Sequence, residues 1–198
     1  MWDQYTKEYS EQLAQIKGID GQDFFISRFE DHSGDIVFFD NLHSNWKEIY
    51  ATAYRLKPSN IFEAGCGGCY HVKNLNTILP GATVFGCDLL QSQLDFGRKF
   101  SDLSDEQFNR LTVCNLLKDV PAGKYDFVFT QAVVMHLSTN NAVAFLRSLA
   151  SIASKYILLV EGVRNHAGWY DLVKSTLPEF EFSTTSKYID YGVFLVRK

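Results

Sequence analysis

The residues with the clearest chemical potential lie at positions 61–70, where the chain reads IFEAGCGGCY. Gly65 and Gly67 would allow the positive φ angles of a sharp turn and let the backbone lie directly against a ligand. Glu63 places a negative charge beneath this turn, which would repel a pyrophosphate and suit a positively charged ligand. A short apolar run, an acid, a glycine loop and then a helical pattern together predict a strand that passes to a helix across a bound cofactor.

This segment resembles the first motif of the class I S-adenosylmethionine-dependent methyltransferases, E/D-x-G-x-G-x-G. The acid and the first two glycines match, and Cys69 stands where the third glycine is usual. The G-x-G-x-x-G pattern of nicotinamide-dependent enzymes fits less well, because Tyr70 occupies its last glycine position. The resemblance implies that the ammonium and sulfonium of S-adenosylmethionine lie near a loop formed by Glu63, Gly65, Cys66 and Gly67.

The ends of the next two predicted strands offer further polar groups. Asp88 follows Glu63 by 25 positions, and the resemblance implies that it binds both ribose hydroxyls, with Leu89 beside it. The alternative for Asp88 is a helix cap or a turn. Asn115 stands where the family often has an aspartate bonded to the adenine amine, with Leu116 as a contact to the ring; Asn115 could instead cap a turn.

The fourth strand, Tyr125–Thr130, leads into two candidates. Gln131 is expected to face the methionine portion of the cofactor, and His136 is the best-placed general base for an oxygen acceptor. The alternative for His136 is a histidine packed under the next loop. The segment lacks the N/D-P-P-Y/F sequence of enzymes that methylate exocyclic amines of bases, which disfavours a nucleic-acid substrate.

Polar and aromatic residues after the fifth strand, Tyr156–Val160, are expected to face the substrate. Arg164 could pair with a substrate carboxylate or phosphate, His166 is a second candidate base, and Trp169 follows. Tyr5 and Tyr9 share one face of a predicted N-terminal helix, either as a lid over the substrate or as packing residues. Each of these assignments has a solvated loop or simple packing as its alternative.

The elements that must position these residues alternate between strand and helix from Asn60 onward, which predicts an α/β fold with a parallel sheet. The runs Phe180–Tyr188 and Val193–Val196 predict an antiparallel C-terminal hairpin. The resemblance implies a Rossmann-like, seven-stranded, mostly parallel sheet with helices on both faces. We expect residues 44–198 to form this domain and residues 1–43 to form an N-terminal helical cap or lid, with helices near 2–17 and 23–30.

Composition and charge restrict the class of protein. The 198 residues carry a net charge of −4 with no run of Lys or Arg, which disfavours a nucleic-acid partner. Apolar runs have strand length, so no membrane span is expected, and no signal peptide is visible. A cytoplasmic protein is therefore expected. Cys66 and Cys69 could form half a zinc site or a redox pair, but packed thiols explain them better, and no metal is predicted.

The resemblance implies an enzyme that transfers a methyl group from S-adenosylmethionine to a small molecule, with oxygen as the expected acceptor. Two alternatives stay open. One is an NAD(P)-dependent oxidoreductase, which Tyr70 and the terminal hairpin disfavour. The other is a methyltransferase-like subunit without catalytic activity that binds the cofactor and serves a partner.

Overall fold

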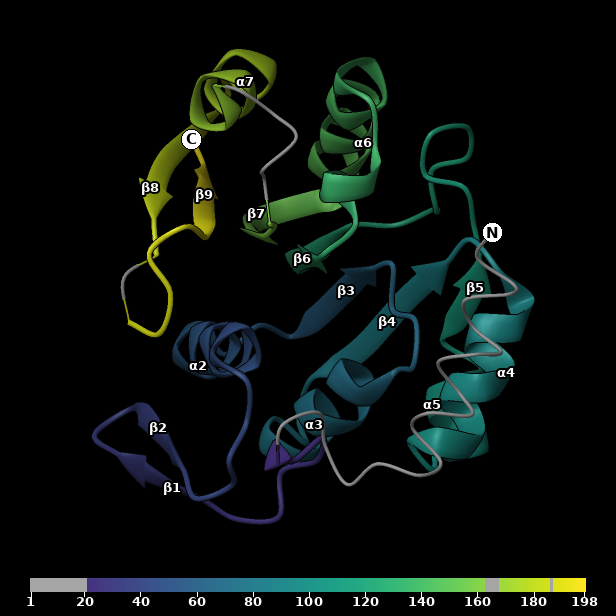
Figure 1. Cartoon of the computed structure of the whole chain (residues 1–198), viewed down its shortest axis with the longest axis vertical. Coiled ribbons are helices and arrows are strands. Elements are labelled where there is room, and N and C mark those ends of the chain that lie inside the picture. The colour runs from purple at the N-terminus through teal and green to yellow at the C-terminus, as the bar shows by residue number, and fades with distance from the viewer. Residues whose placement is uncertain (1–20, 163–167, 186) are drawn as a thin grey trace.

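The computed structural model describes residues 21–162, 168–185 and 187–198, and within these ranges seven strands form the main sheet. Their order across the sheet is β5-β4-β3-β6-β7-β9-β8 (Figure 1). The strands are β3 (Asn60–Ala64), β4 (Thr83–Asp88), β5 (Leu111–Val113), β6 (Tyr125–Gln131), β7 (Ala153–Val160), β8 (Phe180–Thr184) and β9 (Val193–Arg197). β3 to β7 are parallel, whereas β9 is antiparallel to both of its neighbours. The predicted mostly parallel α/β sheet with an antiparallel C-terminal hairpin is confirmed.

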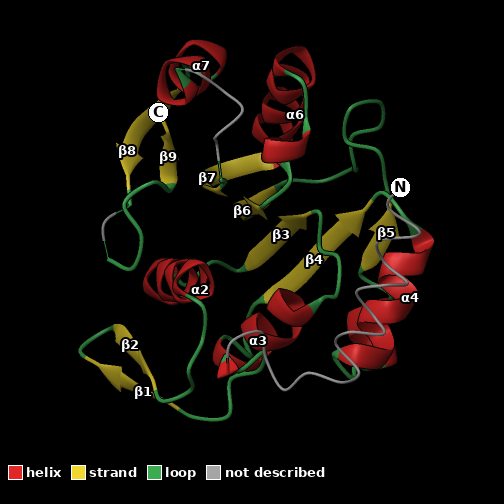
Figure 2. Cartoon of the chain, in the orientation of Figure 1, coloured by secondary structure: helices red, strands yellow, loops and turns green. Residues whose placement is uncertain are grey.

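Helices cover both faces of this sheet (Figures 1 and 2). One face carries α2 (Ser44–Leu56), α3 (Tyr70–Ile78) and α4 (Gln91–Phe100), and the other carries α6 (Thr139–Ile152) and α7 (Trp169–Thr176). Two short elements, α5 (Asp105–Phe108) and the 3-10 turn η2 (Val134–His136), lie in the connections. None of the helices in the described ranges combines the length and apolarity needed to cross a bilayer.

The core is divided by the sheet into two layers, because successive side chains of a strand point to opposite faces. On β3, Ile61 packs with the α2–α4 layer, while Phe62 and Ala64 pack with the α6–α7 layer. All three side chains are fully or almost fully buried. A parallel sheet covered on both faces needs such continuous apolar strands, which explains why the strand segments read as apolar runs in the sequence.

The order of the strands creates a crevice at one edge of the sheet. After β3 the chain moves outward through β4 to β5, then returns to β6 on the opposite side of β3. Ala64, the last residue of β3, is therefore paired with Cys87 of β4 on one side and Thr130 of β6 on the other. Connections that leave in opposite directions from adjacent strands open a binding crevice at their carboxyl ends.

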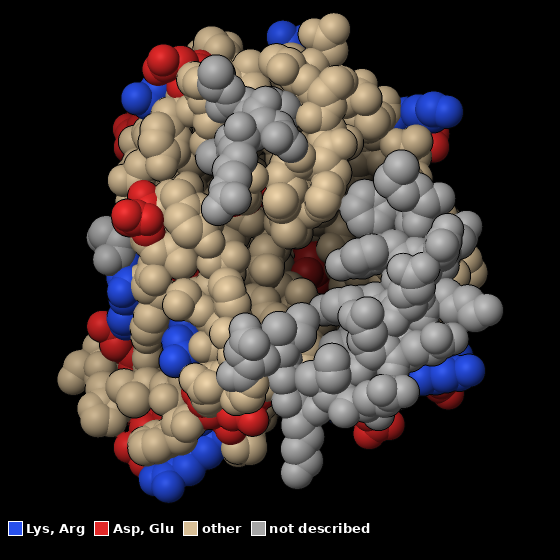
Figure 3. All heavy atoms as spheres, in the orientation of Figure 1, with Lys and Arg blue, Asp and Glu red and all other residues tan. Residues whose placement is uncertain are grey.

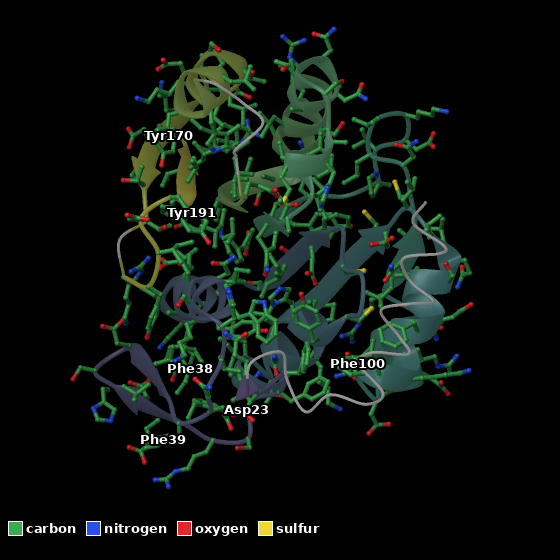
Figure 4. The ribbon with its side chains drawn as sticks, in the orientation of Figure 1. Asp23, Phe38, Phe39, Phe100, Tyr170 and Tyr191 are labelled. Carbon is green, nitrogen blue, oxygen red and sulfur yellow. The ribbon has the colours of Figure 1, made fainter. Side chains whose placement is uncertain are left out.

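The described part of the N-terminal region contains a β-hairpin of β1 (Phe29–His32) and β2 (Asp35–Phe38) rather than helices. The hairpin packs beside α2, and Phe38 lies next to this helix (Figure 4), with its ring centroid 6.2 Å from that of Tyr50. The predicted helix over residues 23–30 is wrong, and the predicted helix over residues 2–17 lies outside the described residues.

Long-range hydrogen bonds explain why residues 23–28 do not form a helix. The side-chain amide of Asn74 on α3 accepts a hydrogen bond from Ile26 N–H at 2.9 Å and donates one to the Phe24 carbonyl at 2.8 Å. The carboxylate of Asp40 accepts the N–H groups of Ser27 and Arg28. Backbone groups that a helix would pair internally are thus taken by distant side chains.

The strand predicted over residues 180–188 ends earlier, at Thr184. The Thr185 hydroxyl donates to the Ile189 carbonyl at 3.2 Å, and Tyr188 N–H donates to the Glu48 carboxylate on α2 at 2.8 Å. These bonds hold the end of the connection against α2 instead of extending the hairpin.

Candidate cofactor and active site

The glycine loop after β3 is a sharp turn held by the neighbouring strand. The N–H groups of Gly65 and Cys66 both donate to the Cys87 carbonyl, at 2.8 and 2.9 Å. Gly65 has φ +83°, and a Cβ on it would lie 2.4 Å from Cγ2 of Val133. Gly67 has φ +43° and Cys69 has φ +57°. Glycine at position 65 is therefore required twice, by its backbone angle and by the close approach of the loop after β6.

Asp88, at the end of β4, is bonded to the glycine loop. Its Oδ2 accepts a hydrogen bond from Gly67 N–H at 3.0 Å, and its Oδ1 accepts one from Leu90 N–H at 3.1 Å. Burial raises the pKa of this carboxyl, against the lowering effect of the backbone hydrogen bonds from Leu90, Gly67 and Leu89. Each oxygen keeps a second lone pair, so Asp88 can shape the turn and still accept hydrogen bonds from a ligand.

A cavity of about 440 Å³ opens at the crevice between β3, β4 and β6, within the rough 300–1,000 Å³ range of small-molecule sites. Eight of the residues chosen from the sequence line it: Gly65, Gly67, Asp88, Leu89, Asn115, Leu116, Gln131 and His136. Sequence reasoning missed other lining residues, among them Tyr70, Gln93, Val133, Leu137 and Phe145. Tyr70 follows the glycine loop and Val133 lies two positions after Gln131, so both could have been found from their places in the sequence.

The described residues that line this cavity include an acidic side chain but no Lys or Arg. Asp88 is the only Asp or Glu among these described lining residues. Figure 3 shows acidic atoms in the recess at the centre of the view, surrounded mainly by uncharged atoms. A cavity with a carboxylate and no cation favours ligands with positive charge and hydroxyl groups over ligands rich in phosphate.

Glu63 lies beneath the loop rather than in the cavity. Its side chain is 2% exposed, and its Oε2 has no hydrogen-bond partner among the described residues. Burial raises the pKa of this carboxyl well above its ordinary value, and the nearby Cys69 and Asp88 raise it further. Cys66 is likewise buried and does not line the cavity. Glu63 therefore lies outside the cavity lining, and its burial favours the neutral form of the carboxyl.

The loop after β5 fixes Asn115 in a local turn. Its Oδ1 accepts a hydrogen bond from Leu117 N–H at 3.1 Å, while the residue also lines the cavity. This bond matches the turn-capping alternative for Asn115, although the oxygen retains a second acceptor site. Among the described residues, no cluster of three metal-ligating side chains occurs, and the thiols at positions 66, 69, 87 and 114 are free.

The loop after β6 carries His136 to the cavity and is anchored by Glu161 at the end of β7. The Glu161 side chain is 1% exposed, and it accepts hydrogen bonds from Val133 N–H at 3.2 Å and Met135 N–H at 3.3 Å. Burial raises the pKa of Glu161 to about 7 despite these bonds. Sequence reasoning did not select Glu161, because nothing in the sequence places it beneath residues 133–135.

The substrate-facing residues expected from the sequence are only partly described. Tyr5, Tyr9, Arg164 and His166 lie outside the described residues. Trp169, at the start of α7, is 4% exposed and packs in the hydrophobic layer between α6, α7 and the sheet. It is not among the residues that line the cavity, so its observed position fits the packing alternative.

Comparison with known proteins agrees with this fold. Residues 61–155 match the model of a family described as a methyltransferase domain. No curated protein sequence matches the chain.

Several solved structures share the fold. Magnesium protoporphyrin IX methyltransferase from Synechocystis PCC 6803 with bound S-adenosylhomocysteine is 22% identical, with a TM-score of 0.59, covering 77% of this chain and 82% of that one. A TehB-like S-adenosylmethionine-dependent methyltransferase from Corynebacterium glutamicum is 16% identical, with a TM-score of 0.61, covering 81% and 90%. Human N-acetylserotonin methyltransferase in complex with S-adenosylmethionine is 15% identical, with a TM-score of 0.60, covering 78% and 51%. Residues 61–155 thus match a methyltransferase domain, and the chain shares the fold of these methyltransferases, in agreement with the class I resemblance seen in the sequence.

Proposed function

We propose that this chain, a class I methyltransferase by its fold and matched domain, transfers a methyl group from S-adenosylmethionine to a small molecule. We further propose that an oxygen atom of that molecule is the acceptor. The substrates named for two structural neighbours, a magnesium porphyrin and N-acetylserotonin, are small molecules and support the substrate class.

One observation carries this proposal: the crevice beside β3 contains Asp88, a glycine loop and no Lys or Arg among its described lining residues. A sulfonium and an ammonium are positively charged, and a ribose presents two hydroxyl donors. A cavity whose described lining is acidic and lacks Lys and Arg stabilises both features. The family's cofactor therefore suits the residues present better than a ligand that carries a pyrophosphate.

The residues fit the cofactor as follows. Asp88 would accept the ribose hydroxyls through its remaining lone pairs, and Leu89 and Leu116 would contact the adenine. Gly65 and Gly67 line the cavity, where their backbone would contact the amino-acid part. Glu63 is buried beneath the loop with an unpartnered oxygen and a raised pKa, and the positive charge of the ammonium above it would favour its ionised form. Asn115 would contact the adenine amine through the acceptor site that Leu117 leaves free.

The bound cofactor would supply a methyl group on a sulfonium, which is already a good leaving group. The protein has to position the acceptor and keep water out. Apolar residues such as Val133, Leu137 and Phe145 line the cavity and serve the second task. His136, which also lines it, is the proposed base that removes the acceptor proton, and His166 is a weaker candidate.

An NAD(P)-dependent oxidoreductase is the second candidate that the glycine loop suggests. Dinucleotide-binding folds extend the sheet after the fifth strand by a further parallel strand at its edge. Here antiparallel β9 lies between β7 and β8, and no cation among the described lining residues could pair with the pyrophosphate. Both observations favour the methyltransferase. A cofactor-binding subunit without activity remains the alternative if turnover is absent.

Calorimetry tests the proposal with three ligands: S-adenosylmethionine, S-adenosylhomocysteine and NADH. We expect binding of the first two and no binding of NADH. Binding of NADH without binding of S-adenosylhomocysteine would overturn the assignment. Release of S-adenosylhomocysteine during a screen of hydroxylated small molecules would then identify the acceptor. Normal cofactor binding without turnover on any acceptor class would favour the non-catalytic alternative.

A further inference from the structure

A chain of buried polar side chains runs from the N-terminal segment through α2 and α3 to the end of β6. Asn74 Nδ2 lies 2.7 Å from the Tyr50 hydroxyl oxygen, which lies 2.8 Å from Nδ1 of His71. Nε2 of His71 lies 2.7 Å from Oε1 of Gln131. Asn74, Tyr50 and His71 are each at most 2% exposed, so the chain is shielded from water until it reaches Gln131 at the cavity.

Backbone groups fix the direction of the first hydrogen bond. Ile26 N–H can only donate, so the atom of Asn74 that it contacts at 2.9 Å must be the amide oxygen. The other half of the amide is then the NH₂ group. It donates to the Phe24 carbonyl at 2.8 Å and to the Tyr50 oxygen at 2.7 Å. The orientation of Asn74 is thus determined by two main-chain groups that cannot exchange roles.

The direction of this first hydrogen bond determines the direction of the hydrogen bonds that follow it. Because the Tyr50 oxygen accepts from Asn74, its single proton is the one that bonds to His71 Nδ1. Burial lowers the pKa of His71 to about 3, so the ring is neutral near pH 7 and carries one N–H. With Nδ1 accepting, that proton lies on Nε2 and is donated to Gln131. The amide oxygen of Gln131 is therefore the half that faces His71.

We propose that Asn74, Tyr50 and His71 are positioning residues that fix Gln131 with its NH₂ group toward the cavity, where it donates to the carboxylate of the cofactor's amino-acid part. Gln131 lines the cavity at the end of β6. The bond from His71 occupies its oxygen, so the group presented to a ligand is a pair of N–H donors. Such a pair selects a carboxylate and not an ammonium.

This inference rests on the proposed function. A comparison of two ligands tests the inference separately from that function. S-adenosylhomocysteine carries the amino-acid part, whereas 5′-methylthioadenosine has the same adenosine and sulfur without it. Their affinities are measured by calorimetry for the wild type and for two isosteric variants. Gln131→Glu keeps the acceptor for His71 and replaces the NH₂ with a carboxylate oxygen. Tyr50→Phe removes the proton that fixes the His71 tautomer.

The matched control is Tyr54→Phe, the same change on the same helix, at a residue whose hydroxyl donates to the exposed Asp31. For Gln131→Glu we expect S-adenosylhomocysteine affinity to fall about tenfold to hundredfold, because a charge-assisted hydrogen bond becomes a repulsion. For Tyr50→Phe we expect a fall of about threefold or more. Affinity for 5′-methylthioadenosine should stay within about twofold in every variant, and Tyr54→Phe should match the wild type.

The possible results distinguish failure of the proposed function from failure of the positioning role. If the wild type binds neither ligand, the proposed function fails. If it binds S-adenosylhomocysteine but Gln131→Glu and Tyr50→Phe weaken both ligands equally, or weaken neither, the positioning role is overturned while the function stands. Nitrogen NMR of the His71 ring gives a readout without ligand. The wild type should show a protonated Nε2 and an unprotonated Nδ1, and the opposite tautomer would contradict the inference.

Discussion

The buried carboxylate of Glu161 accepts a hydrogen bond from the backbone N–H of Val133 at 3.2 Å, although 28 positions separate the two residues. The second carboxylate oxygen accepts Met135 N–H at 3.3 Å. Glu161 thereby ties the end of β7 to the loop that carries His136 to the cavity. The position of the proposed base depends on a residue that does not line the cavity itself.

Removing this anchor should destabilise the protein. Glu161→Ala removes the acceptor of the half-buried N–H groups of Val133 and Met135, and each such loss costs roughly 1–3 kcal/mol. We expect the free energy of unfolding in urea to fall by about 2–4 kcal/mol. Glu179→Ala, a change at an exposed position, should alter it little. Equal stability of the two variants would show that the loop does not depend on Glu161.

Stability should depend on pH through His71. Its pKa in the folded protein, about 3 because of burial, lies below the usual value of 6.5. The neutral ring therefore contributes stability that is complete above pH 6.5 and is lost as pH falls toward 3. The stability advantage of the wild type over His71→Asn should shrink by roughly 1–3 kcal/mol between pH 7 and 4.5.

Urea unfolding at both pH values measures this difference. The control is His32→Asn, since the His32 side chain is 61% exposed in the β1–β2 hairpin. Its difference from the wild type should change little over the same range. A constant gap between wild type and His71→Asn would mean that His71 titrates normally in the folded protein.

Asp88 should dominate the affinity for the nucleoside part. Asp88→Asn removes the charge that strengthens hydrogen bonds from two hydroxyls, and we expect S-adenosylhomocysteine affinity to fall about tenfold to hundredfold. Asp95→Asn, on exposed α4 surface, changes the net charge equally and should bind as the wild type does. Calorimetry measures the affinity of each variant for S-adenosylhomocysteine. Unchanged affinity in Asp88→Asn would limit Asp88 to its bonds with Gly67 and Leu90.

Gly97 on α4 sets how closely this helix approaches the glycine loop. A Cβ at position 97 would lie 2.4 Å from Sγ of Cys69 and 2.9 Å from the Gly67 carbonyl oxygen. Alanine in an unhindered helix is favoured over glycine by about 1 kcal/mol. Gly97→Ala should instead lower the free energy of unfolding by roughly 1–3 kcal/mol, and it should weaken S-adenosylhomocysteine binding. Gly81→Ala, with open space around its Cβ, is the control, and a stabilised Gly97→Ala would contradict the close packing.

His136 should affect turnover more than binding. If it removes the acceptor proton, His136→Ala should lower kcat by about 10²- to 10⁴-fold. Affinity for S-adenosylhomocysteine should stay within about twofold, since only the acceptor side is altered. The assay is methyl transfer to the acceptor identified by the screen. Full turnover in His136→Ala would leave deprotonation to solvent.

The parts of the fold that were predictable are those whose signal is local. Short apolar runs and helical patterns placed most of the elements from Asn60 onward close to their observed bounds, although the strand predicted over residues 180–188 ends at Thr184. They failed for residues 23–30, where Phe24 and Ile26 bond to Asn74 about 50 positions away. A helix needs its own backbone groups, and the sequence does not reveal that a distant amide has taken them.

The residues of the candidate site likewise fall into those that the sequence revealed and those that only the tertiary structure revealed. The glycine loop, Asp88 and the residues at the strand ends were visible in the sequence, because a strand-to-helix turn and the last residue of a strand are local features. Which of them line the cavity, and how Glu161, Tyr50 and His71 act on them, followed only from the tertiary structure. Hydrogen bonds between residues 28 to 60 positions apart depend on which strands are neighbours, and strand order is fixed by packing rather than by any single segment.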